Sequence, residues 1–384
     1  MVSMFERLNK AGLASRQDQV SADKPILLMV SHVVPQPFGP ADSVRAWQWL
    51  RLAGRTHRVL LACAQDGPVN LLHWRVLHAC AGQVVIEPID HLRGALGRLV
   101  APRDSLRAVR GRVARALQGL VREQARCDAV VATHPGLWSL VRDIPAAKRF
   151  CDVPAGPAGD PIPAGELCPG ATAVTVGAGG GCELAGQHPA TLLLPPAVEA
   201  PGVLGLSCVD SVVEGASQAP PPVLGVVYDG TLAGARAQGL DLLRRLARPL
   251  IRAVGGGRIV PVDLGQGMQA LRALATVDVV ALPRGGADGW WPLLQMLALE
   301  RAVIAPWLPA QGPLRRGEHL FVAERPEQWL DLATQLLRWP SLRRQLALSA
   351  GRFTAGHSTI DHSGHAIRPL LAGVPGPRVA ARAA

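Results

Sequence analysis

Short apolar runs alternate with amphipathic stretches along most of the chain. Runs typical of buried strands lie at 25–31, 57–64, 83–87, 128–133, 171–176, 191–194, 223–228, 258–262, 277–282 and 302–305. Apolar positions recur at helical spacing at 42–55, 71–80, 237–254, 266–276, 292–299, 326–337, 341–352 and near 361–372. Continuous apolar strands separated by helices are typical of parallel sheets that are covered on both faces. The pattern therefore predicts an α/β chain with two Rossmann-like domains.

Interruptions of this pattern predict the domain boundaries. A polar lead-in covers 1–24, an N-terminal Rossmann-like domain 25–199 and a C-terminal Rossmann-like domain 223–352. A linker with little periodicity and a proline-rich end joins the two domains at 200–222. We expect a last helix and a basic tail, at 353–384, to cross back to the first domain.

The composition narrows the class of protein. With 48% hydrophobic and 18% charged residues among 384, the chain is too apolar for a disordered protein. No apolar run reaches the ~18–20 residues of a membrane-spanning helix, and the charged beginning of the chain is unlike a secretory signal. Seven widely spaced cysteines without a Cys-x-x-Cys pair favour reduced thiols over disulfides or a zinc site. We therefore expect a cytoplasmic protein without a bound metal or other cofactor.

The formal net charge of +11 favours an anionic partner. Much of the excess lies in 92–126, where arginines outnumber acids and apolar residues recur at helical spacing. Such a helix either lies on an anionic membrane surface or packs its apolar stripe on the core with its arginines in solvent. In the first case the membrane contacts would be Arg103, Arg107, Arg110 and Arg115.

The first strand-to-helix loop, 33–45, lies where a doubly wound sheet binds ligands, beyond a strand's carboxyl end and at a helix N-terminus. Gly39 is the glycine that would let a phosphate approach the backbone, Asp42 is placed to cap the helix, and Arg45 lies one turn into it. The same residues also fit an ordinary proline-rich turn followed by an N-cap.

Two further positions suggest chemistry. His134 directly follows the strand at 128–133, so it lies at a carboxyl edge, where a histidine acts as a base, orients a substrate hydroxyl or has a structural role. Trp290 and Trp291 stand at the start of a predicted helix, where they either stack on a sugar or base or fill a domain interface.

The second half of the chain carries a family resemblance. VDVVALPRGGADGWWPLLQMLALERAVIAP, at 277–306, resembles the donor-binding segment of GT-B glycosyltransferases of the family 4 type. The likeness continues through GEHLFV (317–322) and 324–353, and extends to LLPPAVE (193–199), GTLAGARAQGLDLL (230–243), 26–45 and 57–64. It implies a GT-B arrangement of the two domains and a nucleotide-sugar as co-substrate, with no metal ion.

In that family an Arg and a Lys hold the donor's diphosphate, and two glutamates hold its sugar and ribose. Carried over to this chain, the Arg falls on Thr231 and the Lys on Gln238. The first glutamate falls near Ala287 or, with a gap of one residue, on Asp288, and the second falls on Gln295. Thr and Gln cannot neutralise a diphosphate, whose charge grows as it leaves.

Other residues would then complete a donor site. The nearby loop contributes Gly230, and Trp290 follows the position of the first glutamate. The cations that would replace the missing pair are Arg236, Arg284 or Arg45.

Three hypotheses of different classes follow. The first is a hexosyltransferase that works from a nucleotide-sugar on a glycan or lipid acceptor in surface polysaccharide assembly, peripheral at the inner face of the cytoplasmic membrane. In it, His134 stands on the acceptor side. The second is a non-catalytic GT-B relative that serves an active glycosyltransferase as partner or scaffold, which the missing cations favour. The third, a nucleic-acid-binding protein, is the weakest because only the net charge supports it.

Overall fold

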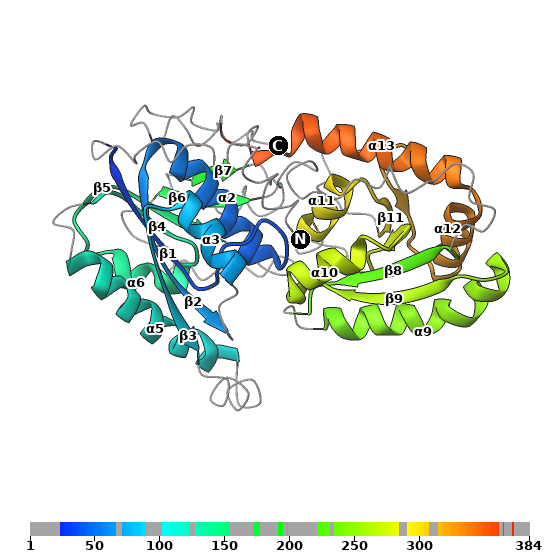
Figure 1. Cartoon of the computed structure of the whole chain (residues 1–384), viewed down its shortest axis with the longest axis horizontal. Helices are drawn as coiled ribbons and strands as arrows, with labels where there is room; N and C mark the ends of the chain where they lie inside the picture. Colours follow the sequence, from blue (N-terminus) through cyan, green and yellow to red (C-terminus); the bar gives the residue numbers. More distant parts are fainter. Residues whose placement is uncertain are drawn as a thin grey trace, which may run out of the picture. The chain divides into compact units, whose positions relative to one another are not determined.

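A computed structural model shows two parallel sheets with their helices (Figure 1). The structure describes residues 24–66, 71–89, 102–122, 127–153, 172–176, 191–194, 198, 221–230, 234–283, 290–306, 314–360, 364 and 371. By its contacts the chain divides into two compact units. The C-terminal unit contains Ala197–His362 together with Pro37–Val44, and the N-terminal unit contains Arg45–Pro196 together with the first strand.

The N-terminal unit is built on a seven-stranded parallel sheet with the strand order β3-β2-β1-β4-β5-β6-β7. Its elements are β1 (Ile26–Ser31), α2 (Ala41–Thr56, whose first residues belong to the other unit), β2 (Arg58–Asp66), α3 (Leu71–Cys80), β3 (Gln83–Ile89), α5 (Pro102–Arg122), β4 (Cys127–Ala132), the 3-10 turn η2 (Pro135–Leu137), α6 (Trp138–Val141), β5 (Ala146–Val153), β6 (Thr172–Val176) and β7 (Thr191–Leu194).

Both faces of this sheet are covered, which is why its central strands are apolar along most of their length. Leu28 and Val30 of β1 pack in one cluster with residues of α5 and α6. On the opposite face, Phe150 of β5 contacts Trp49 of α2, with ring centroids 5.9 Å apart. The continuous burial of β1 after Ile26 follows from this two-sided packing.

The C-terminal unit is built on a five-stranded parallel sheet with the order β12-β11-β10-β8-β9. Its elements are β8 (Val223–Tyr228), α9 (Ala235–Val254), β9 (Arg258–Asp263), the 3-10 turn η6 (Leu264–Gln266), α10 (Met268–Leu274), β10 (Val279–Ala281), α11 (Trp290–Ala298), β11 (Ala302–Ala305), β12 (Phe321–Val322), α12 (Pro326–Arg338) and α13 (Pro340–His357).

Helices also cover both faces of the second sheet. Leu242 and Leu246 of α9 and Trp329 of α12 form one core cluster with Leu224 and Val226 of β8. On the other face α11 and α13 pack on β11 and on each other. Figure 1 shows α9 and α13 on opposite sides of the strands.

In both units an aspartate carboxylate accepts the backbone N–H at the start of a strand. The N–H of Ile26 at the start of β1 donates to Asp128, and the N–H of Val223 at the start of β8 donates to Asp278, both over 2.8 Å. Each aspartate stands at the amino end of the neighbouring strand, β4 or β10. These carboxylates therefore serve as hydrogen-bond acceptors for backbone N–H groups at the strand starts. They lie away from the carboxyl edges, where α/β sheets bind ligands.

The predicted α/β fold with two Rossmann-like halves is confirmed, and the differences are local. Strand β5 and the turn of α6 were not predicted. The strand predicted at 277–282 is only Val279–Ala281, and the helix predicted at 266–276 is η6 followed by α10. Of the predicted last helix near 361–372, the structure describes Gly364 and Leu371, and both group with the N-terminal unit.

Candidate functional site

Each sheet has a point where the strand order reverses, and ligands of open α/β sheets bind at such points. In the N-terminal unit the chain runs from β1 outward to β2 and β3 and then returns to β4 on the other side of β1. In the C-terminal unit it runs from β8 to β9 and returns to β10 on the other side of β8. The loops that follow β1 and β4, and β8 and β10, are therefore the candidate binding loops.

Two histidines meet at the switch point of the N-terminal unit. His32 follows β1, His134 follows β4, and their ring centroids are 5.0 Å apart. At the positions that precede the two histidines in sequence, the hydroxyl of Thr133 donates to that of Ser31 over 3.1 Å. Because β1 and β4 are neighbours in the sheet, residues 102 positions apart meet in two polar pairs.

The hydrogen bonding of His134 restricts what its ring can do. Its Nδ1 accepts the N–H of Gly136 over 3.0 Å, so Nδ1 carries no proton. In the neutral ring the proton then lies on Nε2, which makes that nitrogen a donor. His134 is therefore suited to donating a hydrogen bond to a substrate oxygen, not to removing a proton from it.

Arg45 lies in a buried ion pair. Its guanidinium donates to the carboxylate of Asp152 on β5, and the two residues are 6% and 1% exposed. Asp42 lies in the first turn of α2, one position after the helix begins, and is exposed. Its charge there is favourable to the positive end of the helix dipole, whereas the sequence predicted it at the cap.

A carboxylate and a cation lie at the carboxyl edge of the sheet in the C-terminal unit. Oδ1 of Asp263, at the end of β9, accepts the N–H groups of Gly230 (2.9 Å) and Gly265 (2.8 Å). Gly230 admits this contact because a Cβ there would lie 2.4 Å from Asp263 Oδ2. Burial and Asp263 raise the pKa of Tyr228, while Arg236, which hydrogen-bonds to the phenol, lowers it. Arg236 is exposed at the start of α9, so this edge holds a cation beside a carboxylate.

Gln295, on α11, bonds to the backbone of the first loop. The N–H of Gly39 donates to its Oε1 over 2.9 Å, and its Nε2 donates to the carbonyl oxygen of Gly39 over 3.0 Å. The same segment is held a second time, because the N–H of Ala41 donates to Asp229, the residue after β8, over 3.4 Å. Gly39, Ala41, Asp229 and Gln295 all belong to the C-terminal unit.

The other predicted donor residues are partly described. Gln238 is exposed in the first turns of α9. Trp290 begins α11 as predicted and is half-buried. Thr231, Arg284 and Asp288 lie outside the described residues.

The basic helix of the sequence analysis is α5, and its apolar stripe packs inside the N-terminal unit. Val113, Leu117 and Leu120 are buried in the core beside β2 and β3, whereas Arg110 and Arg115 are exposed. The side chains of Arg103 and Arg107 lie outside the described part. The stripe is thus used by the protein's own core, and any contact of α5 with a membrane would have to be electrostatic.

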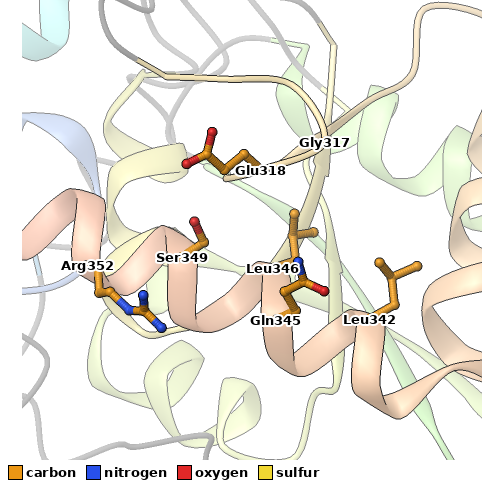
Figure 2. Close-up of a pocket in the computed structure, with 7 residues that line it drawn as sticks. All are labelled: Gly317, Glu318, Leu342, Gln345, Leu346, Ser349 and Arg352. Atoms are coloured by element: carbon orange, nitrogen blue, oxygen red, sulfur yellow. The ribbon is translucent and has the colours of Figure 1, made fainter.

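A pocket of about 480 Å³ opens elsewhere on the C-terminal unit (Figure 2). It lies between one face of α13 and the turn that holds Gly317 and Glu318, with Arg352 at one end. Glu318 lies within 3.3 Å of Arg315. The pocket contains none of the residues selected from the sequence.

The described residues contain neither a candidate metal site nor a candidate membrane-spanning helix. They contain no group of three or more His, Cys, Asp or Glu side chains placed to hold a metal ion. None of their helices is long and apolar enough to cross a membrane. Cys63 and Cys127 are buried thiols, and burial raises the pKa of each.

Comparison with known structures adds the fold family. The chain is similar to the Anabaena protein HepE, solved with UDP and glucose (TM-score 0.56, 12% identity, 91% of this chain and 100% of that one). It is similar to sucrose-phosphate synthase from Thermosynechococcus elongatus (0.58, 12%, 91% and 98%) and to WaaG, a glycosyltransferase of lipopolysaccharide biosynthesis (0.54, 12%, 91% and 100%). The fold is that of the GT-B glycosyltransferases. No family model and no curated protein sequence matches the chain.

Three residues at the sites described above, His32, Asp152 and Asp263, were not predicted from the sequence. His32 follows a predicted strand directly, as His134 does, so the same argument applied to it. Asp152 lies on the strand that was not predicted. Asp263 directly follows the strand predicted at 258–262, but nothing near it in sequence indicates that it holds Gly230.

Proposed function

We propose that the protein is a metal-independent hexosyltransferase that uses a nucleotide-sugar and acts on a glycan or lipid acceptor in surface polysaccharide assembly. The observation that carries the proposal is the pair His32 and His134 at the switch point of the N-terminal unit, in a chain with the GT-B fold. His134 Nε2–H would donate to a hydroxyl or phosphate oxygen in this site. HepE, with the same fold, is described in complex with UDP-glucose, which supports a nucleotide-sugar donor.

The donor would bind at the carboxyl edge of the C-terminal unit. Arg236 lies next to Tyr228 at this edge, which supports it as the cation of the donor site. A diphosphate needs positive charge as it departs, and Arg236 would supply part of it in place of the cations missing at Thr231 and Gln238. The protein would work in the cytoplasm, at the inner face of the membrane, where the exposed arginines of α5 favour anionic lipid.

Replacing Arg236 with Ala is expected to weaken UDP binding by about 10–100-fold, the loss typical of one charge-assisted hydrogen bond. Isothermal titration calorimetry with UDP measures the effect. Arg248→Ala is the matched control, because Arg248 is also exposed on α9 but lies about 18 Å further along the helix. Equal affinities of the wild type and the Arg236→Ala variant would remove Arg236 from the donor site.

Replacing Asp263 with Asn is expected to strengthen UDP binding roughly fivefold, or by about 1 kcal/mol. The amide oxygen still accepts the N–H groups of Gly230 and Gly265, while the negative charge that opposes a diphosphate is removed. Asp263→Ala is the contrasting variant, because it removes the acceptor as well and should loosen the loop. The same titration compares the three proteins, and a weaker Asp263→Asn complex would mean that the diphosphate binds elsewhere.

A second candidate function is a non-catalytic partner or scaffold for an active glycosyltransferase. The observation that favours it is the engagement of Gln295 with the chain's own backbone together with the carboxylate of Asp263 at the donor edge. Binding of a nucleoside diphosphate distinguishes the two candidate functions. If the full-length protein binds no uridine or guanosine diphosphate in calorimetry, the enzyme proposal fails and the partner role stands.

A further inference from the structure

The side-chain amide of Gln295 makes two hydrogen bonds to the backbone of Gly39. It accepts the N–H of Gly39 and donates to its carbonyl oxygen, as one strand does to its neighbour in a sheet. The two distances, 2.9 and 3.0 Å, are those of well-formed bonds. Gln295 is 1% exposed, so its amide meets little solvent. Nε2 also lies 3.4 Å from the carbonyl oxygen of Trp291, one turn earlier on α11. Each polar atom of the side chain therefore has a partner within the protein.

Only a primary amide of this length serves both backbone groups of Gly39. A glutamate, which the family resemblance places at this position, offers acceptors alone when ionised. Its carboxylate would accept the Gly39 N–H but would leave the carbonyl oxygen of Gly39 buried beside a negative charge, which is unfavourable. Glutamine at position 295 thus matches a contact with the chain's own backbone.

The conformation of Gly39 fits the same interpretation. Its φ of 141° lies in a region that side-chain-bearing residues rarely adopt, and it is buried. Two residues later, Ala41 is tied to Asp229, which is 3% exposed. The segment Pro37–Val44 is therefore attached at two points on one unit, through Gln295 and through Asp229.

We propose that Gln295 is a positioning residue that clamps Pro37–Val44, and that it does not bind the ribose of a donor. The statement about the ribose rests on the proposed function, whereas the clamp does not. With the clamp made, the loop before α2 has its conformation before any substrate arrives, which lowers the ordering cost of binding. The ribose of a bound nucleotide is then held by other groups.

Hydrogen–deuterium exchange of the full-length protein tests the clamp. In Gln295→Met, which keeps the volume of the side chain but neither hydrogen bond, exchange at Gly39 and Ala41 should rise about tenfold. Amides of β8 and β10 should keep their wild-type rates. Gln345→Met is the control, because Gln345 is an exposed glutamine of the same unit. Gln295→Glu is the second variant if the methionine variant does not fold, and it too should release the segment.

Calorimetry with UDP tests whether Gln295 binds the ribose of a nucleotide. The wild type and Gln295→Met should bind UDP within about threefold of each other, and saturating UDP should leave Gly39 exchange in the wild type unchanged. Unchanged exchange in both Gln295 variants would overturn the clamp. A tenfold loss of UDP affinity in Gln295→Met, with faster Gly39 exchange in the UDP-bound wild type, would show that the ribose displaces the segment. If the wild type binds no UDP, the proposed function fails, while the exchange measurement still decides the clamp.

Discussion

Replacing Asp152 with Ala is expected to lower the free energy of unfolding of the N-terminal unit by about 3–5 kcal/mol, the usual result of removing one partner of a buried ion pair. Arg45 is only 6% exposed, so its charge would remain in the core without the carboxylate that the wild type provides. Urea denaturation followed by tryptophan fluorescence measures the change, because Trp47, Trp49 and Trp138 are buried in the same unit.

Three further variants separate charge from packing. Asp152→Asn keeps the shape of the side chain and should be nearly as destabilising as Asp152→Ala. The double variant Arg45→Met, Asp152→Leu removes both charges and should recover most of the loss, since an apolar pair of similar volume is often as stable. Asp143→Ala breaks the exposed pair with Arg142 and should change stability by less than about 1 kcal/mol. Wild-type stability of Asp152→Asn would show that the ion pair contributes little.

Replacing His134 with Ala is expected to reduce the rate of sugar transfer, or of donor hydrolysis without acceptor, by about 10²–10³-fold. That is the effect of removing one well-placed donor to a developing charge. Nε2–H is the donor, because Nδ1 is occupied by the N–H of Gly136. The measurement is kcat/KM with a panel of UDP- and GDP-sugars.

The control and the discriminating variant follow from the same geometry. His78→Ala alters an exposed histidine on α3 and should leave the rate unchanged. His134→Gln restores an N–H donor and should recover part of the rate. If instead His134→Gln is as inactive as His134→Ala, and the wild-type rate follows the deprotonation of one histidine, then His134 acts as a base and the tautomer argument is wrong.

Periodicity was sufficient to predict most strands and helices, because strands buried on both faces are apolar along most of their length. It failed at β5, where Lys148 and Arg149 interrupt the apolar run. In the folded chain Lys148 donates to the carbonyl oxygen of Leu371, and Arg149 donates to that of Ile144 over 3.2 Å. The first of these partners is 223 residues away, so no local pattern contains it.

The resemblance at 277–306 led to the right fold, and it placed Gln295 at a glutamate position of the donor site. It did not indicate that Gln295 bonds to Gly39, because the two residues are 256 positions apart. The net charge likewise did not indicate how the basic helix packs. The net charge of +11 is a property of the whole chain, whereas the packing of Val113 and Leu120 into the core decides that the apolar stripe of α5 does not face a bilayer.

The sequence by itself determined the α/β class, the two Rossmann-like halves, and the places of His134 directly after a strand and of Arg45 one turn into the first helix, since all of these depend on local spacing. Only the tertiary structure decided which of these residues meet. Strand order puts His32 beside His134, the two-sided packing of the first sheet buries Arg45 against Asp152, and Gly39 bonds to Gln295 within the C-terminal unit. Such pairings are contacts between distant parts of the chain, and their geometry exists only after the sheets have formed.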